Sequence, residues 1–151
     1  MSDKIQGYFF GLSFAEKNHD QPVGLAGFAI PDLGIVFRSR WAGTLYQCQY
    51  AGLLSLLRFI EMNKESLAQF EFEILSDSTL VINQIAHRLL LTSELAPYYR
   101  AAIDYKNKVN YRVSWVPHDE NVAIAGWGNI PPLNPDLPLN LGLDFHVGQG
   151  E

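Results

Sequence analysis

The chain has 151 residues, a formal net charge of −5 and a single cysteine, Cys48. Its length suits one domain that can bury a core, and its 48% hydrophobic and 18% charged residues exclude an intrinsically disordered chain. A lone cysteine excludes an internal disulfide and a cysteine-based zinc site, and an acidic balance without a basic run argues against a nucleic-acid binder.

No signal for a membrane or for secretion is found in the sequence. No run approaches 18 uninterrupted apolar residues, so no transmembrane helix is expected. The N-terminal MSDKIQGYFF has no basic flank followed by an apolar stretch and a cleavage site. We therefore expect a cytoplasmic protein.

Apolar and aromatic runs predict five strands. The first three follow one another through short connections, which predicts an antiparallel meander. The fourth, FEFEIL, follows a helix and is therefore expected to pair parallel to the first. The predicted strands cover residues 7–15, 23–30, 33–41, 70–75 and 111–117.

Helices are predicted where the apolar spacing changes to three and four residues, most clearly over residues 45–63. Shorter helices are expected over residues 78–86 and 94–108, and a last turn of helix follows within residues 118–126. The order βββ-α-β-α-α-β predicts an α/β fold, with a mixed five-stranded sheet and helices on its faces.

The composition changes at Gly126. From there to the end the chain holds four of its eight prolines, three acidic residues and no Lys or Arg. We expect residues 1–125 to form the domain and residues 126–151 to be an extended Pro/Leu-rich tail. Solvated tails are usually poorer in leucine, which favours packing on the same chain or on a second copy over a free linear motif.

Five segments resemble, in order, segments of type I ribonuclease H. They are AGFAI, TLYQCQYAGLLSLL, SDSTLVINQI, LTSELAPYYRAA and VSWVPHDENVAIAG. In the third, a strand ends at Asp77 and the chain turns directly into a short helix. The last is similar to the family's V-P-basic-x-x-N-x-x-A-D end. The resemblance covers residues 7–126 and implies a ribonuclease H-like fold.

The resemblance also implies a chemistry, because that family hydrolyses the RNA strand of an RNA–DNA hybrid with two Mg²⁺ ions held by four carboxylates. Two such ions about 4 Å apart need several anionic oxygen ligands. The first matching position falls on Phe10 or Gly11, the second on Gln49 and the fourth on Ala125, none of which is acidic. Only the third, Asp77, remains, as a weak metal ligand at most. No cofactor is therefore expected, and Mg²⁺ or Mn²⁺ would be needed only by an active protein.

Three functions from different classes follow. The favoured one is a catalytically inactive ribonuclease H-like protein that acts as a protein-interaction or assembly module, with self-association as a homodimer or a partner bound through the tail. The second is a non-cleaving binder of RNA–DNA hybrid. The third is an active metal-dependent ribonuclease H with a rearranged site. The candidate binding residues are Asp77, His118, Asp119, Glu120 and Asn121, and Asp119 and Glu120 would supply the replacement ligands.

Simpler roles compete with these functions. Asp77 is favoured as a helix N-cap over a leftover metal ligand. Cys48 is expected to be a small buried hydrophobe. Trp41, Trp115 and Trp127 could stack on bases, but core packing is predicted for all three.

Overall fold

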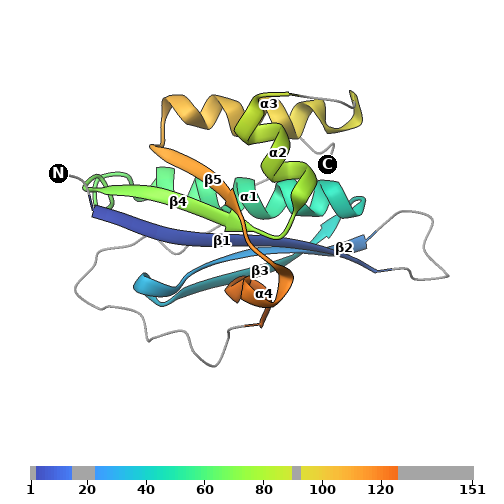
Figure 1. Ribbon diagram of the computed structural model, residues 1–151, viewed down its shortest axis with the longest axis horizontal. Coiled ribbons are helices and arrows are strands. Elements are labelled where there is room, and N and C mark those ends of the chain that lie inside the picture. The colour runs from blue at the N-terminus through green and yellow to red at the C-terminus, as the bar shows by residue number, and fades with distance from the viewer. Residues whose placement is uncertain (1–2, 15–22, 90–92, 126–151) are drawn as a thin grey trace.

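The structure is a computed structural model that describes residues 3–14, 23–89 and 93–125. Five strands form one mixed sheet in the order β3-β2-β1-β4-β5 (Figure 1). Strands β1, β2 and β3 make the predicted antiparallel meander, and β4 pairs parallel with both β1 and β5. The strands are β1 (Asp3–Phe14), β2 (Val23–Ile30), β3 (Ile35–Ala42), β4 (Phe70–Ser76) and β5 (Tyr111–Trp115).

Within these ranges four α-helices accompany the sheet, and Figure 1 shows α1, α2 and α3 on one side of it and α4 on the other. They are α1 (Leu45–Met62), α2 (Thr79–His87), α3 (Ala96–Asp104) and α4 (Val122–Ala125). Short 3₁₀ turns are η1 (Pro31–Leu33), η2 (Ser93–Leu95), η3 (Tyr105–Asn107) and η4 (His118–Glu120). Within the described ranges, none of the helices combines the length and apolar content needed to cross a membrane.

Strand β1 begins at Asp3, four residues before its predicted start. Ile5 is buried while Lys4 and Gln6 are exposed, so the two-residue alternation of a strand already holds there. The predicted strand began at Gly7 because the aromatic run begins there. Because Lys4 and Gln6 are polar, the sequence does not indicate that the strand already includes residues 3–6.

Helix α1 begins at a capping box. The Gln47 backbone N–H donates to Thr44 Oγ1 at 3.3 Å, and the Thr44 N–H donates to Gln47 Oε1 at 2.9 Å. From this start the helix runs across β1 and β2 and buries one broad face. Cys48 is part of that face, and burial raises the pKa of its thiol to about 11, so the prediction of a small buried hydrophobe is confirmed.

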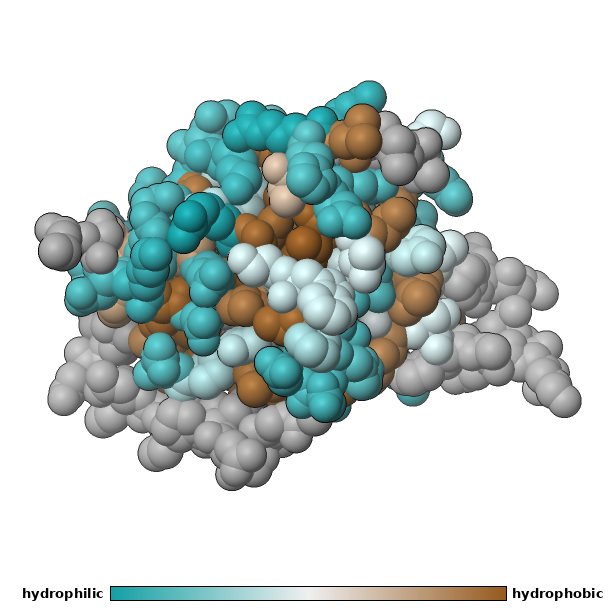
Figure 2. All heavy atoms as spheres, viewed as in Figure 1, coloured by the Kyte–Doolittle hydropathy of each residue, from teal (hydrophilic) through white to brown (hydrophobic). Residues whose placement is uncertain are grey.

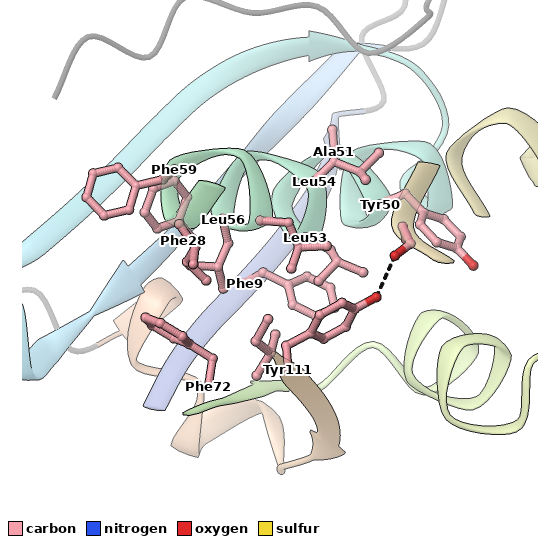
Figure 3. Close-up of a cluster of buried hydrophobic side chains, with 14 of the residues drawn as sticks. Phe9, Phe28, Tyr50, Ala51, Leu53, Leu54, Leu56, Phe59, Phe72 and Tyr111 are labelled. Carbon is pink, nitrogen blue, oxygen red and sulfur yellow. Dashed lines mark hydrogen bonds between the residues drawn. The ribbon is translucent and has the colours of Figure 1, made fainter. Parts of the chain in front are cut away.

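The main core lies between α1 and the sheet (Figure 3). The Tyr111 hydroxyl at its border donates to the Ala102 carbonyl at 2.6 Å and so ties β5 to α3. Large side chains that are fully buried fill the core: Phe9, Phe28, Leu53, Leu56, Phe59 and Phe72. Phe10, Ala29 and Ala123 form a smaller cluster on the opposite face, beneath α4.

Two leucines of α1 test how much of the stability comes from this core. Leu56 is fully buried, whereas Leu45 is 40% exposed. We expect Leu56→Ala to lower the free energy of unfolding by about 2–5 kcal/mol, because it removes packed methyl groups and leaves a cavity. Leu45→Ala, the matched control, should change it by about 0.5 kcal/mol or less. Urea denaturation measures both, and equal losses would contradict this assignment of the core.

Candidate functional site

Three predicted site residues meet where β4 and β5 end. Asp77 directly follows β4, and its Oδ2 lies 2.7 Å from Nδ1 of His118 in η4. Its other oxygen, Oδ1, accepts a hydrogen bond from Nδ2 of Asn121 at 2.8 Å. Both carboxylate oxygens are thus engaged by donors of the protein itself. The structure thus brings together Asp77, His118 and Asn121, three of the predicted candidate binding residues.

Asn121 is the fully buried member of this cluster. Its Nδ2 also donates to the Phe9 carbonyl at 2.8 Å, and its Oδ1 accepts from the Ala123 backbone N–H at 3.1 Å. One amide therefore joins β1, the end of β4 and the start of α4. This is the role expected of a buried polar group whose donors and acceptor are all used.

The prediction that Asp77 caps α2 is wrong. The N-cap residue of α2 is Ser78, and no side-chain hydrogen bond caps the helix there. Asp77 turns instead toward His118 and Asn121, while the Ser78 hydroxyl donates to Gln49 Oε1. The carboxylate is drawn to two side-chain donors contributed by a distant part of the chain, which local sequence does not reveal.

The side of β1 that faces α1 decides between the two candidates for the first carboxylate position. Phe10 points to the opposite face, where it packs with Ala29 and Ala123, so Gly11 is the residue opposite Gln49. A Cβ atom added at Gly11 would lie 2.2 Å from the Gln49 backbone nitrogen. Helix α1 therefore occupies the space that a side chain at this position would need.

The remaining predicted positions do not complete a metal site. Ala125 is the last residue of α4, and alanine has no ligand atom. Asp119 and Glu120 are exposed in η4. In the part of the chain that the structure describes, no group of three or more His, Cys, Asp or Glu side chains could hold a metal ion. With one carboxylate engaged at this edge, the described residues do not fit a pair of Mg²⁺ ions.

Trp115 is an exposed neighbour of the cluster, which corrects the prediction of core packing for it. Its side chain is 53% exposed, and its indole N–H donates to the Asp77 carbonyl at 3.3 Å. Trp41, by contrast, is buried as predicted. Trp127 and the predicted tail lie outside the described residues. Trp115 and His118 therefore both contact Asp77, and the indole ring is exposed to solvent.

The comparison with solved structures decides the fold. LC11-RNase H1 in complex with an RNA/DNA hybrid matches with a TM-score of 0.61 and 18% identity, over 83% of this chain and 92% of that one. The fold is ribonuclease H-like.

Two further structures agree with this ribonuclease H-like fold. RNase H1 from the halophilic archaeon Halobacterium salinarum has a TM-score of 0.57 and 18% identity, over 82% of this chain and 98% of that one. The N-terminal RNase H domain of Rv2228c from Mycobacterium tuberculosis has a TM-score of 0.56 and 22% identity, over 78% of this chain and 86% of that one. Neither a family model nor a curated protein matches the sequence. At these identities the likeness concerns the fold alone.

Gly11 provides the first test of the site's geometry. Gly11→Ala should lower the free energy of unfolding by about 1–3 kcal/mol, because the new Cβ must push the α1 backbone away from β1. Ser13→Ala, an exposed change in the same strand, serves as the control and should have little effect. Thermal and urea unfolding measure both variants. A Gly11→Ala protein as stable as the wild type would show that α1 does not close this position.

Asn121 provides the second test. Asn121→Ala should destabilise the protein by about 1–3 kcal/mol, since the Phe9 carbonyl loses the amide donor that satisfies it. Asn83→Ala, an exposed change on α2, is the matched control and should cost much less. Urea denaturation followed by tryptophan fluorescence compares the two. Similar small losses in both variants would mean that Asn121 does not cross-link the strands.

Proposed function

We propose that this protein is a ribonuclease H-like module that does not cleave nucleic acid by a two-metal route and that acts by binding a protein partner or a second copy of itself. The observation that carries the proposal is the state of Asp77. Its Oδ2 lies against Nδ1 of His118, and its Oδ1 accepts a hydrogen bond from Nδ2 of Asn121. It acts as a structural link where a nuclease of this fold would need a metal ligand.

The surroundings of Asp77 support the same proposal. Gln49 is neutral and its side-chain oxygen accepts from Ser78, and Gly11 has no space for a carboxylate. A metal ion at Asp77 would have to displace His118 or Asn121, and the buried Asn121 amide would then lose a partner.

A rearranged nuclease site would have to use Asp119 and Glu120. Both side chains are exposed, and neither belongs to a metal-binding group within the described ranges. Exposed carboxylates bind a divalent ion weakly unless several of them converge on it. These positions therefore give the third hypothesis no specific support.

One observation favours nucleic-acid binding as a second candidate function. Exposed Trp115 and His118 both contact Asp77, and an indole ring can stack on a base whatever its sequence. A protein of the same fold, LC11-RNase H1, has been solved with an RNA/DNA hybrid. The net charge of −5 opposes this function, because phosphate binding depends on clustered Lys and Arg.

A labelled RNA–DNA hybrid separates these functions. Titrated with the hybrid in Mg²⁺ or Mn²⁺, the wild type should neither cleave it nor bind it tightly, because the Asp77 carboxylate is already engaged by His118 and Asn121 and the chain carries a net charge of −5. Cleavage is scored on a gel and binding by fluorescence anisotropy. Asp77→Asn is the control for the metal route, and Trp115→Ala is paired with Tyr46→Ala, which alters another exposed aromatic residue.

Each other outcome has a defined meaning. Cleavage that disappears in Asp77→Asn would overturn the non-catalytic proposal. Binding without cleavage that is lost in Trp115→Ala and kept in Tyr46→Ala would establish the second candidate function. Binding unchanged in both variants would place the nucleic acid elsewhere on the surface.

A further inference from the structure

A pocket of about 530 Å³ lies between the first turn of α1 and helix α2. Its apolar lining comes from Tyr46 on α1, Leu80 on α2 and Leu89 just after α2. No residue of the Asp77 cluster belongs to this lining, so the pocket is separate from the site described above. Its volume falls within the range of about 300–1,000 Å³ that small-molecule sites occupy in proteins.

The apolar part of the lining is poorly covered. Tyr46 is 46% exposed and Leu89 is 54% exposed, although both are large hydrophobic side chains. Leu80 is half-buried and packs against the main core. An apolar ligand that covered these side chains would gain free energy in proportion to the area removed from water.

The polar part of the lining contains a buried donor that has no acceptor. Gln84 lines the pocket but is only 2% exposed, and its Oε1 accepts a hydrogen bond from the Tyr50 hydroxyl. Burial raises the pKa of Tyr50, so that hydroxyl stays protonated and can donate. Within the described ranges, Nε2 of Gln84 has no hydrogen-bond partner.

An unpartnered buried amide is uncommon in folded proteins and costs free energy. A ligand oxygen that accepted a hydrogen bond from Gln84 Nε2 would remove this cost and would also orient the ligand. A hydrocarbon of the same shape would fill the apolar part of the pocket and leave the amide unpaired. Gln84 therefore favours a ligand that carries an acceptor.

The charge of the lining favours a neutral ligand. Its other polar side chains are Thr79, Asn83 and His87, all of them exposed. Among the described residues that line the pocket, none is a Lys, Arg, Asp or Glu. A charged ligand would lose hydration there without meeting a permanent counter-charge.

The visible surface favours a small occupant over a broad one. The face in Figure 2 carries hydrophobic residues as small areas separated by hydrophilic ones, so the described residues in view offer no wide apolar interface. A small molecule needs only the walls of one pocket and a few well-placed polar groups.

We propose that the pocket between α1 and α2 binds a neutral, mainly apolar small molecule that carries a carbonyl oxygen. The apolar part of the ligand covers Tyr46, Leu80 and Leu89, and its carbonyl oxygen accepts a hydrogen bond from Gln84 Nε2. This site goes beyond the function proposed above, because it requires neither a metal ion nor a protein partner.

Two probes of nearly the same shape test the proposal in NMR titrations of the full chain. Acetophenone has an aromatic ring and a carbonyl oxygen, whereas ethylbenzene has the ring without the acceptor. Both should give saturable shifts of the backbone amides of the lining residues. Acetophenone alone should also move the Gln84 side-chain amide protons downfield, because only it can accept their hydrogen bond.

A matched pair of variants isolates the donor. Gln84→Met removes the amide and keeps a side chain of similar length, so the ratio of acetophenone affinity to ethylbenzene affinity should fall about threefold to tenfold. Gln6→Met makes the same change at an exposed glutamine of β1, outside the pocket, and should leave the ratio unchanged. Backbone amides of β4 report whether each variant is folded.

Several results would overturn the proposal. They are the absence of saturable shifts in the lining with either probe, an unchanged affinity ratio in folded Gln84→Met, and Gln84 amide protons that acetophenone does not move downfield. The last of these is measured on the wild type, so it decides even if Gln84→Met does not fold. Leu89→Ser, an exposed change, should weaken both probes about threefold and keep their ratio, and unchanged affinities would place the probes outside this pocket.

Discussion

Helix α1 lies so close to β1 that backbone meets backbone. A Cβ atom at Gly52 would lie 2.4 Å from the Phe10 carbonyl oxygen, and one at Gly11 would lie 2.2 Å from the Gln49 nitrogen. This approach lets Leu53 and Leu56 reach the sheet and close the core around Phe9. The same contact also removes space at the end of β1. The contact between α1 and β1 therefore determines both the packing of the core and the space available beside Gly11.

At that edge a carboxylate connects parts of the chain. Asp77 sits between His118 and Asn121, and Asn121 in turn binds the Phe9 carbonyl. Hydrogen bonds to a charged acceptor are stronger than those between neutral groups, so this cluster holds η4 and α4 against β1 and β4. A residue type suited to metal binding thus serves here to position the chain, because both of its carboxylate oxygens meet side-chain donors.

The sequence predicted what depends on local periodicity and missed what depends on distant partners. The strand order and α1 follow from alternation and three–four spacing, which act over a few residues. The orientation of the Asp77 side chain depends on Asn121, 44 residues away, whereas the local sequence favours helix capping. Likewise only the packing of α1 shows that Gly11 faces Gln49 while Phe10 faces away. Trp115 reads as a core residue from its strand position, yet β5 is an edge strand and leaves the ring exposed.

Among the described residues, no group of three or more metal-ligand side chains gathers at this edge, and this changes its energetics. Several carboxylates within a few ångströms repel one another unless a cation or a proton neutralises them, so a two-metal site lowers the stability of the metal-free fold. Here Gly11 and Gln49 are neutral, and Asp77 meets an imidazole and an amide. The Asp77 carboxylate is thus satisfied by hydrogen bonds within the protein.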